Sequence, residues 1–230
     1  MKITYLGQAG LLFETNGLKI VVDPYLSDSV AKVNPKNWRR VPVDERFLQI
    51  KPDVLICTHD HLDHLDPETL EHYFGPGAKM TVLASANGWA KLRQYGGDNN
   101  YVLFDRHTEW TQNEVRFISV KAVHSDVTAI GVIIEAEGKR YYISGDTLYS
   151  RDLLEDLEGS FEAAFMPVNG VGNNMNMADA ARLAGQLDAK YIVPVHVGLF
   201  DELSGQDLQV SNRVVPEIYH EICLSGEASK

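Results

Sequence analysis

Hydrophobic residues in the first part of the chain form short apolar runs that are separated by turn residues. Asn16-Gly17 is a strong hairpin signal between two such runs. The run Val54-Leu55-Ile56-Cys57 contains no polar position and is bounded by polar residues, which is typical of a short buried strand. We therefore predict an opening β-meander and a buried strand, at residues 2–6, 10–14, 18–23 and 54–57.

Strand-like and helix-like patterns alternate over the rest of the chain. A helix is predicted after Asp66, an N-cap residue, because Pro67 suits the first helical position. Further strands are predicted at residues 80–84, 101–104, 114–122, 128–136, 139–144, 163–167 and 191–195. Further helices are predicted at residues 86–95, 150–157, 177–187 and 206–222. This alternation implies an α/β fold, and the length fits a single domain over residues 1–230.

Composition and charge narrow the class of protein. An apolar content of 44% and a charged content of 23% are ordinary for a globular protein. The sequence shows no secretory signal, no apolar run near the ~18 residues needed to cross a bilayer, and only two cysteines. We therefore expect a cytoplasmic protein that acts on neither membranes nor nucleic acid, since the net charge is −11. A small, even anionic, substrate and a homo-oligomer both remain open.

The segment that follows the predicted strand at residues 54–57 carries the strongest chemical signal. Within seven residues, Thr58 to His64, it holds three histidines and two aspartates. Clustering such groups is costly unless a cation joins them. Imidazole and carboxylate together suit zinc, manganese or iron. The sequence therefore predicts a metal site where a strand ends.

The metal-binding segment resembles a known signature. His59-x-His61-x-Asp63-His64 is similar to the H-x-H-x-D-H motif of the metallo-β-lactamase superfamily, and three later motifs follow in family order. They contain His124, Asp146 (in Ser-Gly-Asp-Thr) and His196. The resemblance extends from about Lys2 to His196 and implies a four-layer αββα sandwich with the metal site at the edge of its two sheets.

The resemblance also implies roles for these residues. One metal ion would be held by His59, His61 and His124. A second would be held by Asp63, His64 and His196, with Asp146 bridging both. The implied cofactor is one or two divalent ions, zinc or manganese, with iron also open. Asp60 would orient a ligand histidine or the loop backbone, and Asp60 and Asp63 are candidates for returning a proton in catalysis.

A narrower likeness concerns the substrate. Asp23 to Ser29, Arg39 to Pro42, and the asparagine-rich loop after Pro167 resemble the L-ascorbate-6-phosphate lactonase-like branch. That branch implies hydrolysis of a small ester, most of all a sugar-derived and phosphorylated lactone, by an activated hydroxide. Its asparagines suggest neutral hydrogen-bond donors to the substrate at Asn169, Asn173 and Asn176. The long loop at residues 25–47 suggests a lid, on which Arg39 and Arg40 would grip an anionic group.

Three alternatives remain at this point. A metal-dependent phosphodiesterase would use the same ligands. A di-iron or sulfur redox protein is disfavoured because flavodiiron oxidoreductases have glutamate where this chain has Asp60. A non-catalytic binding protein is disfavoured because degenerate relatives are expected to lose ligands, and here all seven are present.

Overall fold

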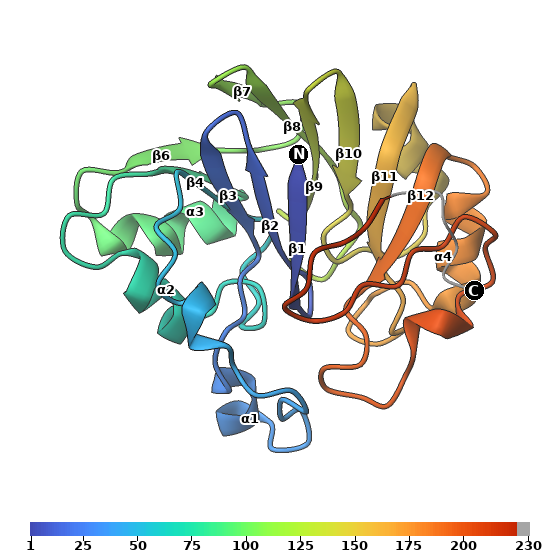
Figure 1. Cartoon of the computed structure of the whole chain (residues 1–230), viewed down its shortest axis with the longest axis horizontal. Helices are drawn as coiled ribbons and strands as arrows, with labels where there is room; N and C mark the ends of the chain where they lie inside the picture. Colours follow the sequence, from blue (N-terminus) through green and yellow to red (C-terminus); the bar gives the residue numbers. More distant parts are fainter. Residues whose placement is uncertain (225–230) are drawn as a thin grey trace.

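The computed structural model describes residues 1–224 and shows two sheets packed face to face (Figure 1). The first sheet has the strand order β1-β2-β3-β4-β5-β6 and the second the order β12-β11-β10-β9-β8-β7. The first contains β1 (Lys2–Gly7), β2 (Gly10–Thr15), β3 (Leu18–Val22), β4 (Val54–Cys57), β5 (Thr81–Ala84) and β6 (Asn100–Leu103). The second contains β7 (Glu109–Gln112), β8 (Val115–Lys121), β9 (Ile130–Ala136), β10 (Lys139–Ile143), β11 (Ser160–Pro167) and β12 (Asp188–Val195).

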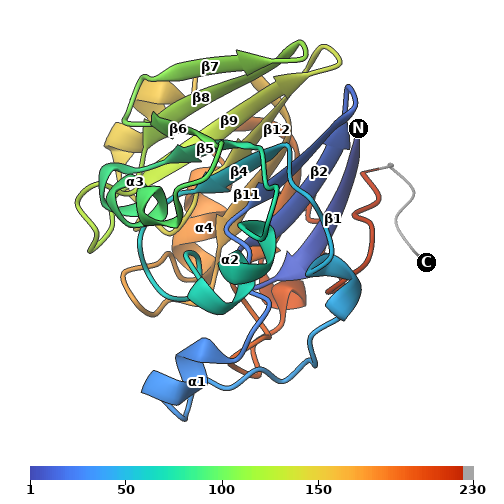
Figure 2. The ribbon, with the colours of Figure 1, turned by 90° about the vertical axis from the view of Figure 1, so that its left-hand side faces the viewer.

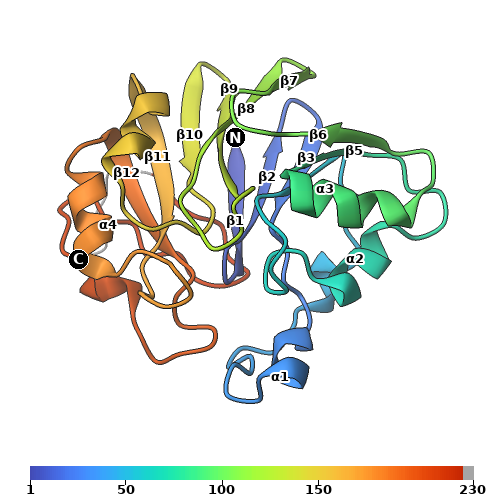
Figure 3. The ribbon, with the colours of Figure 1, turned by 180° about the vertical axis from the view of Figure 1, so that it is seen from behind.

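Helices cover the outer faces of both sheets. They are α2 (Pro67–Tyr73), α3 (Ala86–Leu92) and α4 (Met177–Ala184), whereas α1 (Ser29–Val33) lies at one edge of the sandwich. Short 3₁₀ turns are η1 (Glu45–Phe47), η2 (Arg93–Tyr95), η3 (Arg151–Asp156) and η4 (Gly205–Asp207). Figure 2 shows α2 and α3 outside the first sheet, and Figure 3 shows α4 on the opposite side of the molecule. The predicted four-layer αββα sandwich is therefore confirmed. No helix within residues 1–224 combines the length and apolar character needed to span a membrane.

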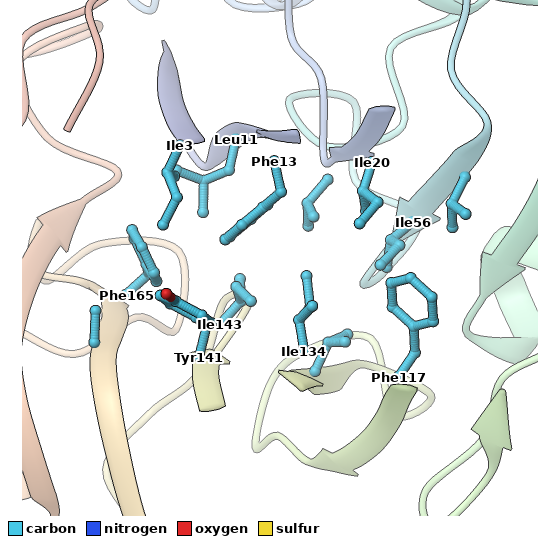
Figure 4. Close-up of a cluster of buried hydrophobic side chains, with 14 of the residues drawn as sticks. Ile3, Leu11, Phe13, Ile20, Ile56, Phe117, Ile134, Tyr141, Ile143 and Phe165 are labelled. Carbon is cyan, nitrogen blue, oxygen red and sulfur yellow. The ribbon is translucent and has the colours of Figure 1, made fainter. Parts of the chain in front are cut away.

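The core lies between the two sheets, where alternate residues of facing strands interdigitate (Figure 4). Phe13 of the first sheet packs edge-on against Tyr141 and Phe165 of the second, with ring centroids 6.2 and 5.9 Å apart. Side chains such as Ile20 and Phe117 are fully buried in the same layer. Burial of this apolar surface stabilises the sandwich by about 25 cal/mol per Å².

Local sequence signals explain several element boundaries. Asp66 caps α2 by accepting hydrogen bonds from the backbone N–H groups of Glu68 and Thr69, with Pro67 at the first helical position. Asn16 and Gly17 adopt positive φ values of 49° and 74° in the hairpin between β2 and β3. Strand β7 lies in a segment for which no strand was predicted, and the residues that turn it into β8 also have positive φ.

The helix predicted at residues 206–222 is wrong. This segment contains only the short turn η4 and otherwise pairs irregularly, at Arg213 with β12 and at Glu221 with the edge strand β1. The backbone N–H of Tyr5 donates to the carbonyl of His220 (3.1 Å), and the N–H of Ile222 donates to the carbonyl of Ile3 (2.8 Å). An exposed strand edge needs such partners, and Pro216 disfavours a helix, so edge pairing prevails.

Candidate metal centre

Strands from both sheets end at one edge of the sandwich, the edge that carries α1 in Figure 1. In the first sheet β3 and β4 are parallel, and in the second β10, β11 and β12 are parallel. Because parallel strands have their carboxyl ends at the same edge, the loops that follow them converge. The predicted ligands follow β4, β8, β10 and β12, so this topology gathers residues that are far apart in the sequence.

His59, His61 and His124 form the first cluster. Each offers one ring nitrogen, and these three atoms lie within 4.8 Å of one another. Nδ1 of His61 lies 3.1 Å from Nε2 of His124, although one comes from the loop after β4 and the other from the loop after β8. The structure thus brings together the three residues that the resemblance assigns to one metal ion.

Asp63, His64 and His196 form the second cluster, again with ligand atoms within 4.8 Å of one another. Nε2 of His196 lies 3.1 Å from Oδ2 of Asp63 and 3.3 Å from Oδ2 of Asp146. Nε2 of His64 lies 3.3 Å from Oδ1 of Asp146. Asp146 therefore contacts both histidines of this cluster, and its bridging role to the first cluster stays a prediction.

Three buried atoms at the two clusters make no hydrogen bond of acceptable geometry among residues 1–224, although those of His64 and Asp146 lie 3.3 Å apart. They are Nε2 of His59, Nε2 of His64 and Oδ1 of Asp146. An unpaired buried polar atom costs about 1–3 kcal/mol, so native structures rarely leave several together. All three belong to predicted ligands, and imidazole nitrogen and carboxylate oxygen are ligands of zinc, manganese and iron. Divalent cations at the two clusters would satisfy these three atoms, so these residues fit the metal that the resemblance implies.

The second nitrogen of the ligand histidines has a protein partner. Nδ1 of His59 lies 3.1 Å from the hydroxyl of Thr58, and Nδ1 of His124 lies 3.2 Å from the carbonyl oxygen of Asn173. A proton on Nδ1 that is donated to these oxygens leaves the lone pair of Nε2 free. This is the tautomer that a metal ligand needs.

Asp23 is a buried carboxylate to which the sequence assigned no separate role. It accepts hydrogen bonds from the backbone N–H (2.8 Å) and the hydroxyl (2.6 Å) of Thr58, and its Oδ2 lies 2.9 Å from Nδ1 of His64. Asp23 therefore holds the start of the metal-binding segment and orients His64. The signal in the sequence was a carboxylate at the end of a predicted strand and directly before Pro24.

Asp146 is positioned by two neighbours. Gly145 has a φ of 59°, and a Cβ there would lie 2.7 Å from the carbonyl oxygen of Ile130, so the loop after β10 can approach so closely only with glycine. Nδ2 of Asn174 donates to Oδ2 of Asp146 at 2.8 Å, and Asn174 is buried. The asparagine-rich loop was predicted to serve the substrate, but this member supports a metal ligand.

Burial and neighbouring charges divide the histidines into two groups. Burial lowers the pKa of His59 and His124, which are therefore neutral at pH 7. Burial also disfavours protonated His64 and His196, but nearby carboxylates outweigh it; Asp146 and Asp63 raise the pKa of His196 to about 10. The pKa values of Asp63 and Asp146 are held below the usual range despite burial, because His64 and His196 face them. Without metal, the second cluster thus holds protons that a cation would displace.

A cavity of about 660 Å³ opens over the clusters. Its described lining includes the site residues His61, Asp63, Asp146 and His196 and five side-chain amides: Gln8, Asn37, Asn169, Asn173 and Asn174. Val30, Val171 and Phe200 add apolar surface, and Asp201 adds a carboxylate. No lysine or arginine is among the described residues of this lining.

The structure places only some of the predicted catalytic and substrate residues at the cavity. Asp63 lines the cavity, whereas Asp60 does not; the carboxylate of Asp60 pairs with the ammonium of Lys91 at 2.7 Å. Asn169 and Asn173 line the cavity. The side chain of Asn176 instead caps α4 by accepting a hydrogen bond from the N–H of Asp179 (2.9 Å).

The structure does not bring the two predicted arginines to the cavity. The Arg39 side chain is buried and donates to the carbonyl of Tyr25 (2.7 Å) and the hydroxyl of Tyr219 (2.6 Å). The Arg40 side chain donates to the carbonyl of Phe200, and its guanidinium lies over the ring of Trp38. Both arginines therefore tie the long loop to the protein body.

Arg39→Ala is expected to destabilise the fold rather than weaken substrate binding. Losing hydrogen bonds from a buried charged group costs about 2–3 kcal/mol, so urea unfolding should show a lower free energy of unfolding by that amount. The Michaelis constant should stay within about two-fold of the wild-type value, because Arg39 lies outside the cavity and its loss removes no contact with the substrate. A raised Michaelis constant with unchanged stability would instead support the predicted lid.

Comparisons with known proteins agree with this geometry. The chain matches the family described as "Beta-lactamase superfamily domain" over residues 2–196. It is 30% identical over 230 aligned residues to a "UPF0173 metal-dependent hydrolase" of Geobacillus thermodenitrificans, with 95% of each chain covered. The isothiocyanate hydrolase from Delia radicum gut bacteria has a similar fold, with a TM-score of 0.75, 21% identity, and 97% of this chain and 98% of that chain covered. Igni18, a metallo hydrolase from Ignicoccus hospitalis, gives a TM-score of 0.73 and 20% identity, with 96% and 97% covered.

These similarities define the family but not the branch. The family match contains all seven predicted metal ligands, and the UPF0173 relative covers nearly the whole chain. The likeness to the L-ascorbate-6-phosphate lactonase-like branch remains a prediction. With its ligands converging at the edge of an αββα sandwich, the chain belongs to the metallo-β-lactamase superfamily and is a metal-dependent hydrolase of the UPF0173 kind.

Proposed function

We propose that this hydrolase cleaves a small uncharged ester, above all a lactone. The observation that carries the proposal is the cavity: it contains the metal-binding residues, and its described lining combines amides and apolar side chains with no lysine or arginine. A phosphate or carboxylate on the substrate would lack a cationic side chain there and would face Asp201. An uncharged ester instead finds amide donors and apolar contacts.

The residues have separate tasks in this reaction. Divalent cations held by the two clusters of histidine and aspartate would lower the pKa of a coordinated water toward ~7 and would polarise a carbonyl oxygen. Asn173 lies on the cavity wall, where its amide can orient the ester by hydrogen bonds. Val171 and Phe200 exclude water from the apolar part of the substrate.

Asp63 is better placed than Asp60 to return a proton to the leaving alcohol. It lines the cavity, and one of its oxygens is held by Gln8, whose Nε2 lies 2.7 Å from Oδ2. Asp60 lies outside the described lining and is neutralised by Lys91. Proton transfer requires hydrogen-bond reach of the reacting group, which favours Asp63.

A substrate panel tests the proposal. Protein reconstituted separately with zinc and with manganese is assayed on neutral lactones, their phosphorylated counterparts, an aryl isothiocyanate and bis(nitrophenyl) phosphate. We expect the kcat/KM of neutral lactones to be at least about 10-fold higher than that of the phosphorylated ones. A factor of this size corresponds to the free energy of one charge-assisted hydrogen bond, which the phosphate group would not find in this cavity.

Each other outcome has a definite meaning. Preference for the phosphorylated lactones would refute the uncharged substrate. Preference for bis(nitrophenyl) phosphate would establish the phosphodiesterase alternative. The isothiocyanate is included because it also presents a small neutral electrophilic carbon, and turnover of it alone would replace the ester proposal.

A further inference from the structure

Gln8 occupies an unusual position in the turn between β1 and β2. It is buried and adopts a φ of 54°, a left-handed conformation that is uncommon for a residue other than glycine. Its carbonyl oxygen accepts hydrogen bonds from the backbone N–H of His196 (2.6 Å) and the hydroxyl of Tyr5 (2.8 Å). The backbone of Gln8 thus fixes the point where the chain leaves β12 and presents His196.

The side chain of Gln8 reaches the same cluster. Its Nε2 lies 2.7 Å from Oδ2 of Asp63, and 3.2 and 3.0 Å from Nδ1 and Nε2 of His196. Asp63 carries only acceptors at this site, so the amide of Gln8 must act as the donor. Gln8 therefore contacts two of the three members of the second cluster.

Asn169 approaches His196 from the other side. Its Nδ2 lies 2.9 Å from Nδ1 of His196, and its buried Oδ1 has no hydrogen-bond partner among residues 1–224. A ligand histidine that uses Nε2 carries its proton on Nδ1, and that proton needs an acceptor. A half-turn of the Asn169 amide exchanges its oxygen and nitrogen and places Oδ1 against Nδ1.

We propose that Gln8 and Asn169 form an amide clamp that positions the ligands of the second cluster. Gln8 acts as a donor that orients Asp63, and Asn169 acts as an acceptor that fixes His196 in the tautomer with a free Nε2. This role of Asn169 replaces substrate binding as its main function. The proposal concerns metal binding and is independent of which ester is cleaved.

The donor role of Gln8 and the acceptor role of Asn169 can each be tested by a substitution. Gln8→Met keeps the volume of the side chain but removes the donor, and Asn169→Ala removes the acceptor. Each should weaken the binding of the metal held by Asp63, His64 and His196 by about 10–100-fold, the usual effect of losing a group that orients a ligand. Asn169→Asp retains an acceptor and should rescue metal binding to within about three-fold of the wild type.

Metal binding is measured directly, without an activity assay. Metal-free proteins are titrated with Co²⁺, and affinity and stoichiometry are read from the visible spectrum and from calorimetry. Gln112→Met is the matched control, because Gln112 is a partly buried amide that bonds Thr81 far from the cavity. It should bind Co²⁺ as the wild type does.

Two results would overturn the clamp. The first is wild-type Co²⁺ affinity and stoichiometry in both Gln8→Met and Asn169→Ala. The second comes from long-range ¹H–¹⁵N NMR spectra of the zinc-loaded protein, where we expect the His196 proton on Nδ1; a proton on Nε2 would refute the acceptor role of Asn169. If Asn169→Ala lowered kcat/KM without changing metal binding, Asn169 would be a substrate residue instead.

Discussion

Replacing Asp146 with asparagine is expected to lower kcat/KM by roughly 10³-fold on the substrate that the panel identifies. Asp146 is the carboxylate that faces both His64 and His196, at 3.3 Å each, and its buried Oδ1 makes no hydrogen bond of acceptable geometry within residues 1–224. Asparagine keeps the shape but loses the negative charge that a cation requires. Losing a metal that activates water costs several kcal/mol of transition-state stabilisation, and 4 kcal/mol corresponds to about 10³ in rate.

The same variant should also bind fewer metal ions. Elemental analysis after desalting is expected to show at least one ion fewer per chain than in the wild type. Asp188→Asn is the control, because Asp188 is exposed at the start of β12 and lies outside the described cavity lining. Wild-type turnover by Asp146→Asn in metal-replete buffer would show that the cation does not depend on this carboxylate.

The metal ligands could be predicted from the sequence because four of them lie close together and the others follow recognisable strands. His59, His61, Asp63 and His64 come within six residues, directly after the buried strand β4. Strand patterns then place His196 at the carboxyl end of a strand. Once parallel strands are assumed, their carboxyl ends meet, so the site follows from local patterns together with the topology.

The groups that orient the ligands could not be found in this way. Gln8, Asp23 and Asn174 act on residues that are 28 to 188 positions away in the chain. Nothing in the neighbourhood of Gln8 distinguishes it from an ordinary turn residue, and the local patterns around Asp23 and Asn174 do not indicate which ligand each one contacts. Their roles depend on which loops meet, and one sequence does not contain that information.

Arg39 illustrates a second limit. The long loop at residues 25–47 contains arginines and was therefore predicted to bind an anion. The direction of a long side chain, however, depends on which hydrogen-bond acceptors lie within its reach. In the fold, the carbonyl of Tyr25 and the hydroxyl of Tyr219 lie closer to it than the cavity does. Tyr219 belongs to the carboxyl-terminal segment, whose pairing with β1 was itself not predicted.

Removing the metal is expected to lower the melting temperature by roughly 10 °C at pH 7. A ligand present at about 1,000 times its dissociation constant stabilises the native state by about 4 kcal/mol, and each kcal/mol shifts the melting temperature of a chain of this size by about 2–4 °C. Calorimetry with excess Zn²⁺, and with EDTA in its place, measures the difference. Equal melting temperatures in the two conditions would contradict a native metal site.

The difference should widen as pH rises from 6.5 to 9. In the metal-free protein the pKa of His196 is raised to about 10, so the stability contributed by protonated His196 is complete below the unfolded pKa of ~6.5 and is lost as pH rises toward 10. His64 changes in the same direction. Asp63 and Asp146 have depressed pKa values, so their contribution is already complete above pH ~4 and does not change across this range.

The metal-loaded protein behaves in the opposite way, because a cation binds only deprotonated ligands and its affinity increases with pH. Other groups titrate alike in both forms, so a difference in melting temperature that stayed constant from pH 6.5 to 9 would show that protons and metal do not compete for His64 and His196.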